Sequence, residues 1–518
     1  MEHNIGRFLT KRAELNPDLD AIVDVARGET FSFRQLNDRS NQTANALTGA
    51  GVVKGDRVGL LAMNSVEFEE SFMAIAKIGA TIVPLNWRLV ADELSFILTD
   101  SDVTALIYGA EFDPVIKELH ERGAGDGGTP ITTWIRIGED SGRPEFALDY
   151  AAIHAAASTD EPDVETSSDD LLYVMYTSGT TGLPKGVMHT HSTVMWALMT
   201  IDATADMHYA DRYLVALPLF HVGALSPAIG CMYAGATQVV MREFDPVKVW
   251  QLIVEQKITT GLLVPAMLQF MLLVKEQVGD VEHPQLRWFM SGASPVPKSL
   301  IEAYVALGIE IHQVYGLTES CGPACLIGPD DAIARAGSTG KAFFFTEVRV
   351  VDSDGNDTAD NEPGEVLVKG DHVMVGYLNR PDATAETLVD GWLHTGDVAL
   401  RDEDGFIYIH DRIKDMIISG GENVYPAEIE NVVMGLEGVA DCAVIGVPST
   451  KWGESPCVVA VKAEGAEITE DEIIAHCDGK LARYKLPRVA VFVSEIPRNP
   501  TGKALKRILR DDLDISLD

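Results

Sequence analysis

Apolar and polar positions along the first third of the chain follow two patterns, one typical of helices and one typical of buried strands. Residues 31–47 and 68–78 carry apolar side chains at helical spacing, whereas 57–62, 82–85 and 105–108 are short apolar runs. Strands that alternate with helices in this way are typical of βαβ units and a mostly parallel sheet. The sequence therefore predicts an α/β fold for this part of the chain.

The same pattern continues after residue 170 and then changes. Apolar runs at 171–175, 213–221, 286–290 and 310–314 predict strands that lead into small or polar residues, and 262–274 predicts a strand followed by a core helix. Beyond residue 336, short β-prone runs flank Asp-Gly pairs, which favour tight hairpins. These pairs are Asp354-Gly355, Asp390-Gly391 and Asp404-Gly405.

The last hundred residues predict a compact α+β module. Helices are expected at 428–434 and 471–481, and strands at 443–447, 457–461 and 489–493. We therefore expect a large N-terminal domain of mostly parallel α/β subdomains with a β-rich subdomain, followed by a small mobile α+β domain. A chain of 518 residues is also too long for one ordinary core.

Charge and cysteine usage narrow the classes of function. The formal net charge of −37 disfavours nucleic acid and anionic membranes as partners. One basic island departs from this balance, because residues 480–510 hold nine Lys and Arg against one acid, which favours an anion-facing surface over a solvated helix face. The six cysteines form no metal or disulfide pattern, and no apolar stretch reaches the length of a membrane span, so we expect a cytoplasmic protein.

The run YTSGTTGLPKG at residues 176–186 carries the strongest chemical signal. Three glycines let backbone amides close on an anion, the hydroxyl side chains donate further hydrogen bonds, and Lys185 adds a point charge. These are the groups that bind a polyphosphate, although the spacing is not that of a Walker A loop. A flexible linker is the competing interpretation, but a linker needs neither the preceding buried strand nor a single lysine.

A second group of chemistry-bearing residues follows the strand at 310–314. Glu319 supplies the oxygen ligand that Mg²⁺ prefers, Tyr315 offers an aromatic face to a base, and the Thr318 hydroxyl can bind a phosphate. Thr318 and Glu319 can equally cap a helix, and the two roles are compatible. His221, at the end of an apolar run, is either a satisfied core histidine or the border of a pocket.

Together these motifs resemble the adenylate-forming superfamily of acyl-CoA synthetases, adenylation domains and firefly-type luciferases. The resemblance covers nearly the whole chain and is strongest for the fatty-acyl-CoA synthetase branch. Its motifs here are YTSGTTGLPKG (176–186), YGLTE (315–319), TGD (395–397), the run at 411–430, and PRNPTGK (497–503). The aspartate of TGD, Asp397, is expected at a strand end.

The resemblance implies a role for individual residues. Glu319 would hold Mg²⁺, Thr318 the α-phosphate, His221 the substrate carboxylate and Lys503 the reacting groups, while Lys414 would be a hinge. The ATP-binding residues would be Thr177, Ser178, Gly179, Thr180, Thr181, Gly182, Lys185, Gly292, Ala293, Ser294, Tyr315, Gly316, Asp397 and Arg412. Coenzyme A would pass Ser419, Gly420 and Gly421.

The resemblance also implies domains and an activity. Residues 1–412 would bind ATP and the acid, and residues 413–518 would form the small mobile domain. The expected enzyme is an AMP-forming acid–thiol ligase that converts a carboxylic acid, best a medium- or long-chain fatty acid, to acyl-AMP with ATP and Mg²⁺ and then to acyl-CoA. An aryl or hydroxycinnamate CoA ligase, an enzyme that loads a carrier protein, a luciferase-type oxygenase and a non-catalytic nucleotide sensor are the alternatives.

Overall fold

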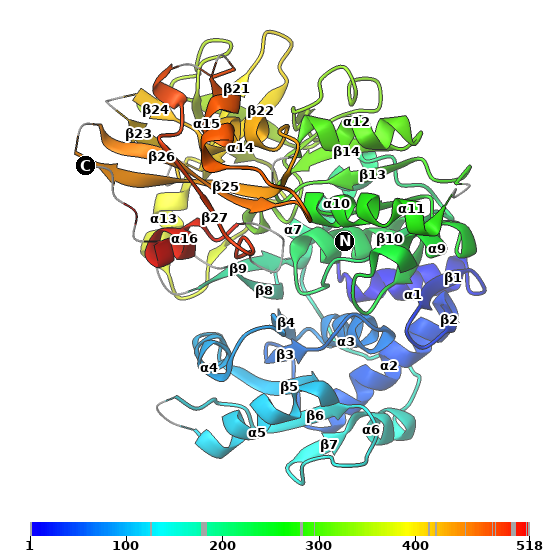
Figure 1. Cartoon of the computed structure of the whole chain (residues 1–518). Coiled ribbons are helices and arrows are strands. Elements are labelled where there is room, and N and C mark those ends of the chain that lie inside the picture. Colours follow the sequence, from blue (N-terminus) through cyan, green and yellow to red (C-terminus); the bar gives the residue numbers. More distant parts are fainter. Residues whose placement is uncertain are drawn as a thin grey trace.

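The computed structural model describes most of the chain, and Figure 1 shows its elements in order from the N-terminus (blue) to the C-terminus (red). The described residues are 3–124, 127–177, 184–279, 283–294, 296–412, 415–419, 422–450, 452–478, 480–481, 483–498, 504–513 and 515. Within these ranges, no helix is both long and apolar enough to cross a lipid bilayer.

An eight-stranded sheet contains the predicted βαβ units. Its order is β19-β9-β8-β4-β3-β5-β6-β7, with parallel pairs from β8 to β7 and antiparallel pairs at β9 and β19. The strands are β3 (Arg57–Leu61), β4 (Thr81–Pro84), β5 (Val103–Gly109), β6 (Thr133–Ile137), β7 (Ala147–Asp149), β8 (Leu171–Thr177), β9 (Lys185–Thr190) and β19 (Gly376–Tyr377). The accompanying helices are α2 (Phe33–Gly49), α3 (Val66–Lys77), α4 (Ala91–Asp100), η1 (Ala110–Phe112), α5 (Asp113–Arg122), α6 (Tyr150–Ala156) and α7 (His191–Thr204).

A nine-stranded sheet lies beside the first. Its order is β16-β15-β14-β13-β12-β10-β11-β1-β2, and β14 through β1 are all parallel. The strands are β1 (Asp20–Asp24), β2 (Glu29–Ser32), β10 (Arg212–Val215), β11 (Thr237–Val240), β12 (Thr260–Leu262), β13 (Trp288–Ser291), β14 (Glu310–Tyr315), β15 (Cys325–Leu326) and β16 (Lys341–Ala342). Its helices are α1 (Gly6–Leu15), α8 (Val222–Ala234), α9 (Pro246–Glu255), α10 (Pro265–Leu273), α11 (Lys275–Val278), α12 (Lys298–Ala306) and η2 (Thr318–Ser320).

Helix α3 explains how the core holds together. Ser65 caps the helix by accepting a hydrogen bond from the backbone of Phe68, and all 12 of its residues are buried. Lys77 at its end is also buried, and its Nζ donates to oxygen atoms of Thr10, Asn37, Asn41 and Glu161. One apolar cluster draws residues from α3 and from both large sheets, so these sheets share a core.

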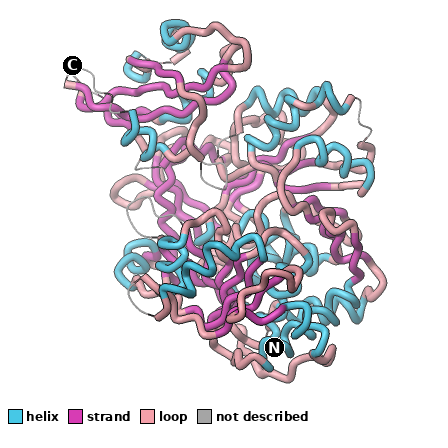
Figure 2. The backbone as a smooth tube through the Cα atoms, turned by 60° about the horizontal axis from the view of Figure 1, so that its bottom comes forward, coloured by secondary structure: helices cyan, strands magenta, loops and turns pink. Residues whose placement is uncertain are grey.

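Two smaller sheets follow. The first pairs β17-β18-β21-β20, with β22 on β21, and the second pairs β24-β23-β26-β25, with β27 on β26. The first sheet contains β17 (Glu347–Val351), β18 (Gly364–Lys369), β20 (Leu388–Val389), β21 (Trp392–Arg401) and β22 (Ile407–Arg412), with helix α13 (Pro381–Thr387). The second contains β23 (Ile417–Ser419), β24 (Glu422–Val424), β25 (Val439–Ser449), β26 (Gly453–Lys462) and β27 (Val489–Phe492), with α14 (Pro426–Val433), α15 (Glu470–Cys477), η3 (Arg483–Lys485) and α16 (Lys506–Leu513). Figure 2 shows the second sheet at one end of the molecule.

The α/β class predicted from the sequence is confirmed, and so are the predicted hairpins. Asp390 and Gly391 form a two-residue turn with positive φ between the paired residues Val389 and Trp392. The β-rich region and the final α+β module also follow the predicted order.

Three local predictions are wrong. The strand predicted at 213–221 ends at Val215, because the side chain of Asn64 takes the carbonyl of Leu217 and the N–H of Leu219 that a ladder would use. His221 is therefore not at a strand end but precedes helix α8. Asp397, predicted at a strand end, lies within β21.

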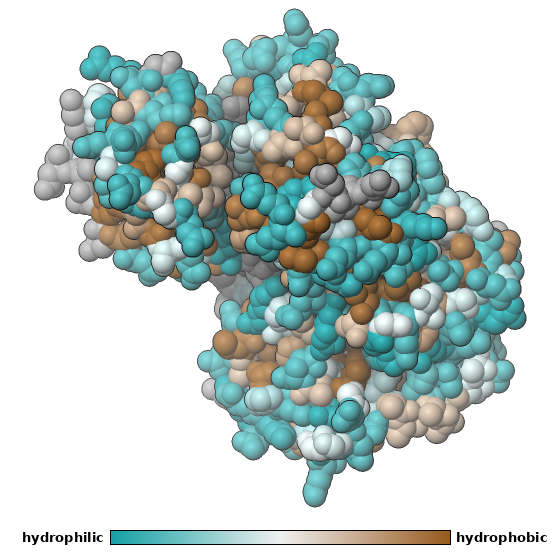
Figure 3. All heavy atoms as spheres, turned by 45° about the vertical axis from the view of Figure 1, so that its right-hand side comes forward, coloured by the Kyte–Doolittle hydropathy of each residue, from teal (hydrophilic) through white to brown (hydrophobic). Residues whose placement is uncertain are grey.

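The predicted core helix at 262–274 is partly a surface helix, which is the third difference. Phe270 and Leu273 on α10 are 53% and 65% exposed. Figure 3 shows apolar residues scattered over a mostly hydrophilic face, in keeping with the strongly acidic composition.

Candidate functional site

The glycine-rich run joins two paired strands. β8 leads into it and β9 leads out, so Thr177 and Lys185 are cross-strand partners at the loop end of the hairpin. The predicted residues Ser178, Gly179, Thr180, Thr181 and Gly182 lie outside the described residues. The hairpin still fixes where the loop begins and ends, because β8 is held on its other side by β4.

Lys185 faces an aromatic residue from a distant part of the chain. Strand β19 pairs with β9, which places Tyr377 opposite Val187 and brings its ring to 4.7 Å from Nζ of Lys185. A cation over an aromatic face is attracted by the electron-rich ring. Tyr377 therefore orients the lysine that the sequence singled out.

The same tyrosine contacts the predicted metal ligand. The Tyr377 hydroxyl donates a hydrogen bond of 2.8 Å to Oε1 of Glu319, which is half-buried in η2. Lys185 and Glu319 are 134 positions apart in the sequence, yet one side chain touches both. In a metal–polyphosphate complex, a carboxylate can bind the metal ion and a nearby ammonium group can bind the phosphates.

Two buried histidines contact the turn that carries Glu319. Nε2 of His189 lies 2.8 Å from the carbonyl oxygen of Thr318, and Nδ1 of His372 lies 2.9 Å from that of Ser320. Burial lowers the pKa of His189 to about 4 and also lowers the pKa of His372. Both imidazoles are therefore neutral at pH 7.

Tyr315 and Asp397 form a second linked pair. The hydroxyl of the half-buried Tyr315 donates to Oδ2 of Asp397 at 2.7 Å, and burial followed by this carboxylate raises the tyrosine pKa well above its usual value. Asp397 is the cross-strand partner of Arg412, whose backbone alone is described. The tertiary structure thus brings together three predicted nucleotide-site residues from β14, β21 and β22.

The small-residue turn after β13 lies beside the turn after β14. Parallel pairing aligns Ser291 with Gln313, so Gly292 and Gly316 leave neighbouring carboxyl ends of the sheet. A Cβ on Gly292 would lie 2.3 Å from the carbonyl oxygen of Val314, and Ala293 adopts a φ of +68°. Only glycine fits this close approach, and the half-buried Ser294 completes the turn.

His221 lies at the entrance of helix α8. Its Nε2 is enclosed and has no hydrogen-bond partner in the described part of the chain, while burial lowers its pKa to about 3. A buried nitrogen without a partner is costly and is common where a ligand supplies the missing group. Nearby, a Cβ on Gly322 would lie 3.7 to 3.8 Å from atoms of Ser226 and Val222, so the start of α8 and the turn after η2 lie close together.

The carboxyl-terminal site residues are only partly described. Ser419 is buried at the end of β23, whereas Lys414, Gly420, Gly421 and Lys503 lie outside the described residues. Arg498 and Ala504 form a β-bridge on either side of the lysine loop.

The basic island is less available to a ligand than its local composition predicts. Four of its cations form ion pairs with acids from residues 415–441. These pairs are Lys485 with Glu428, Arg498 with Asp441, Lys506 with Glu430 and Arg510 with Asp415.

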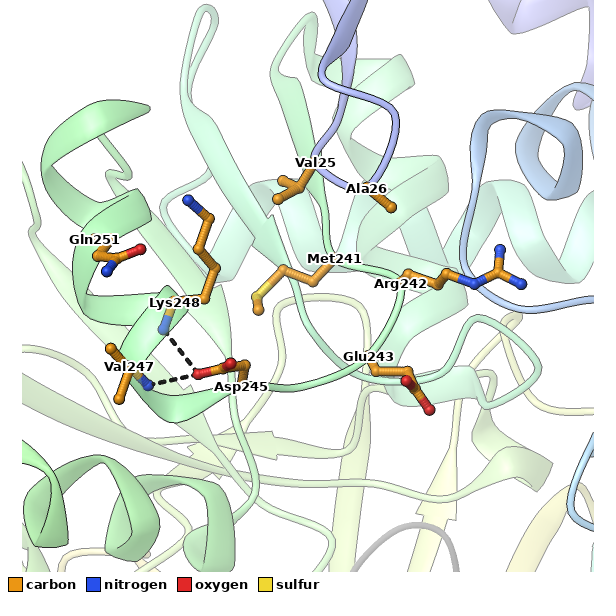
Figure 4. A pocket seen from close by; sticks show the side chains of 9 residues that line it. All are labelled: Val25, Ala26, Met241, Arg242, Glu243, Asp245, Val247, Lys248 and Gln251. Atoms are coloured by element: carbon orange, nitrogen blue, oxygen red, sulfur yellow. Dashed lines mark hydrogen bonds between the residues drawn. The ribbon is translucent and has the colours of Figure 1, made fainter.

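A groove of about 290 Å³ lies elsewhere, near the carboxyl ends of β1 and β11 (Figure 4). Asp245 there caps α9 by accepting hydrogen bonds from the backbone of Val247 and Lys248. Its cations are engaged, since Arg242 pairs with Glu111 and Lys248 with Glu255. The groove contains none of the predicted site residues, so we place the functional site around Lys185, Glu319 and Asp397 instead.

Sequence reasoning missed Tyr377, His189 and His372. His189 had a usable signal, because alternation along a strand places it on the same face of β9 as Lys185. Tyr377 and His372 had none, since both reach the site only through the pairing of β19 with β9 and the loop before it.

Nearly the whole chain is similar to known proteins. The family model "AMP-binding enzyme" matches residues 9–378, and "AMP-binding enzyme C-terminal domain" matches residues 428–503. The long-chain-fatty-acid–CoA ligase FadD13 of Mycobacterium tuberculosis is 47% identical over 98% of both chains. A feruloyl-CoA synthase from Amycolatopsis is 37% identical over 98% of both. The solved structure of a Mycobacterium tuberculosis fatty acyl CoA synthetase is 45% identical, with a TM-score of 0.78 over 98% of both chains.

Proposed function

The chain belongs to the AMP-binding enzyme family and is an AMP-forming acid–thiol ligase, and from this premise we propose that its acid substrate is a medium- or long-chain fatty acid. The enzyme uses ATP to convert the acid to acyl-AMP with release of pyrophosphate, and then transfers the acyl group to coenzyme A. The observation that carries this proposal is the 47% identity, over nearly the whole of both chains, to a ligase named for long-chain fatty acids.

The walls of the acyl site support an apolar substrate. The side chain of Val222 lies 3.8 Å from the position where a Cβ on Gly322 would project, and the hydroxyl of Ser226 beside it is already engaged, since it donates to the carbonyl of Cys321 at 2.8 Å. An aryl acid of the hydroxycinnamate class is the second candidate, supported by the lower identity to feruloyl-CoA synthase. Loading of a carrier protein is less favoured than either.

In the first half-reaction, the substrate carboxylate attacks the α-phosphorus and pyrophosphate leaves. Lys185 and the hydroxyls of the glycine-rich loop bind the phosphates, Thr318 binds the α-phosphate, and His221 positions the carboxylate. No covalent enzyme intermediate is needed, because positioning and charge neutralisation lower the barrier. The nucleoside would lie against Tyr315, with adenine on the turn at Gly292, Ala293, Ser294 and Gly316, and the ribose on Asp397 and Arg412.

Glu319 fits a magnesium ion. It offers one carboxylate to a cation that prefers oxygen ligands and commonly takes the rest from phosphates and water. When bound, Mg²⁺ supplies charge neutralisation on the phosphates. Tyr377 orients this carboxylate from the protein side by the hydrogen bond at 2.8 Å.

For the second half-reaction we propose a division at residues 412 and 413. Residues 413–518 would rotate about Lys414, withdrawing Lys503 from the reacting groups and bringing Ser419, Gly420 and Gly421 alongside the thin pantetheine arm.

The six cysteines are free and buried, which supports a cytoplasmic enzyme.

A substrate panel tests the proposal. The purified chain is incubated with ATP, Mg²⁺, coenzyme A and single acids, including saturated fatty acids of increasing length and ferulate, without any carrier protein. We expect pyrophosphate release and acyl-CoA to peak for a medium or long fatty acid. A peak for ferulate would replace the fatty substrate by the aryl one, and acyl-AMP without thioester would refute the ligase.

A further inference from the structure

The turn that presents Glu319 is held by side chains from two distant segments. His189 belongs to β9, which also carries Lys185, whereas His372 belongs to the loop between β18 and β19. Both side chains are fully buried, and each contacts a carbonyl oxygen next to Glu319 along the chain, at Thr318 and Ser320. The carbonyl of Glu319 itself accepts the backbone N–H of Met374 at 2.8 Å. Three consecutive carbonyl groups are therefore fixed from outside the turn.

The chemistry of these contacts assigns the ring protons. A carbonyl oxygen only accepts, so Nε2 of His189 and Nδ1 of His372 must each carry a hydrogen. The other nitrogen of each ring faces a threonine hydroxyl, at 3.1 Å for Thr193 and 2.8 Å for Thr346. The two histidines thus have opposite tautomers, and each donates its ring N–H to a carbonyl oxygen of the turn.

The ring of His372 packs against Gly370, where any side chain would collide with it. A Cβ on Gly370 would lie 2.7 Å from Nε2 of His372. An aliphatic side chain could fill the same volume, but it would leave a buried carbonyl and a buried hydroxyl without a partner. His372 therefore supplies hydrogen bonds that an aliphatic side chain of the same volume could not supply.

We propose that His189 and His372 are positioning residues for the magnesium–nucleotide site, which hold the backbone of the Thr318–Ser320 turn so that Glu319 points at the metal. This inference rests on the proposed function, because it takes Glu319 as the magnesium ligand. It also links the strand of Lys185 to the turn of Glu319, so that the phosphate-binding and metal-binding groups keep a fixed separation.

Paired substitutions separate the hydrogen bond from the volume. In His189→Gln and His372→Asn the amide N–H replaces the donating ring nitrogen, whereas His189→Leu and His372→Leu remove it. ATP binding is measured by isothermal titration calorimetry, with excess EDTA and over a series of Mg²⁺ concentrations. We expect the leucine variants to bind ATP in EDTA with the same Kd as the wild type. The factor by which Mg²⁺ lowers this Kd should be about tenfold smaller in the leucine variants than in the wild type. The amide variants should stay within about threefold of the wild type.

Two controls complete the design. His208→Leu makes the same exchange at a histidine that is 58% exposed and should change nothing. Thr346→Val leaves both histidines in place and removes only the hydroxyl partner of His372, so a smaller loss of magnesium-dependent tightening is expected. Thr346→Val and the amide variants decide the question if a leucine variant fails to fold.

Each result supports or overturns the inference. Leucine variants that melt at a lower temperature but keep the full effect of Mg²⁺ would show a purely structural role and overturn it. Amide variants as weak as the leucine variants would also overturn it, because the donated N–H would then not be what matters. A wild-type protein without magnesium-dependent ATP binding would refute the proposed function, and the positioning role with it.

Discussion

The hydroxyl of Tyr377 donates a hydrogen bond of 2.8 Å to Oε1 of Glu319, and this contact joins two segments 58 residues apart. Tyr377 also places its ring beneath Nζ of Lys185. One side chain therefore sets the direction of a carboxylate and of an ammonium group, and both depend on the pairing of β19 with β9.

Replacing the hydroxyl alone tests this link. We expect Tyr377→Phe to keep the ring under Lys185 but to lower kcat/KM for ATP about tenfold or more, since hydrogen bonds to charged groups contribute about 1.5–3 kcal/mol. Steady-state kinetics with ATP varied measures the effect. Tyr408→Phe is the matched control, because its hydroxyl also contacts a carboxylate, Asp402, but away from the site. Equal losses in both variants would contradict the role of Tyr377.

The contact between Tyr315 and Asp397 predicts a different kinetic pattern. Removing the hydroxyl in Tyr315→Phe takes one hydrogen bond from the buried carboxylate proposed to hold the ribose. Because the ribose is bound alike before and during the reaction, we expect KM for ATP to rise about tenfold while kcat changes less than about threefold. A large fall in kcat at unchanged KM would argue against a ribose role for Asp397.

The turn after β13 should not tolerate a side chain. Gly292→Ala places a Cβ 2.3 Å from the carbonyl oxygen of Val314, so we expect a loss of about 1–3 kcal/mol in unfolding free energy and weaker ATP binding. Gly328→Ala is the control, since a Cβ there meets no atom within 4 Å, and it should fall within about 0.5 kcal/mol. Denaturant unfolding and ATP titration of both variants provide the measurement.

The buried His191, which contacts the N-terminal segment at Ile5, predicts that the stability of the fold depends on pH. Nδ1 of His191 accepts the backbone N–H of Ile5 at 3.1 Å, and burial lowers its pKa from 6.5 to about 4. Between these values the unfolded chain binds a proton that the folded chain does not. The contribution of His191 to stability is therefore present above pH 6.5 and decreases as pH falls toward 4, by up to about 1.4 kcal/mol per pH unit.

His191→Asn tests this sign, because the amide oxygen can still accept from Ile5 but does not titrate. We expect the variant to lose less stability than the wild type between pH 6.5 and 4, with a slope smaller by about one proton. Unfolding in urea at several pH values measures it, and identical slopes would contradict the assignment.

The role proposed for Lys503 predicts that one substitution separates the two half-reactions. We expect Lys503→Ala to lose most acyl-AMP formation, since Lys503 is the cation proposed to bridge the carboxylate and the α-phosphate. The variant should still convert supplied acyl-AMP and coenzyme A to the thioester. Arg507→Ala, at a position 79% exposed, controls for the loss of a nearby charge. An equal loss of both half-reactions would refute this division.

The sequence by itself established the order of elements and the residues with chemical potential. The strands at β3, β4, β5 and β14 and the turn at Asp390-Gly391 follow from steric preferences and burial that act within a few residues. Gly292 and Gly316 predict turns from local sequence alone. The Thr- and Ser-rich loop and the YGLTE run are likewise recognisable without knowledge of any distant residue.

The tertiary structure alone decided which of these residues meet. Asn64 ended a strand that looked continuous to His221, and acids at 415–441 paired with four cations of the basic island. Tyr377, His189 and His372 joined the site through strand pairing and loop packing. Such contacts depend on the free energy of the whole folded chain, summed over segments hundreds of residues apart, and no local pattern contains that sum.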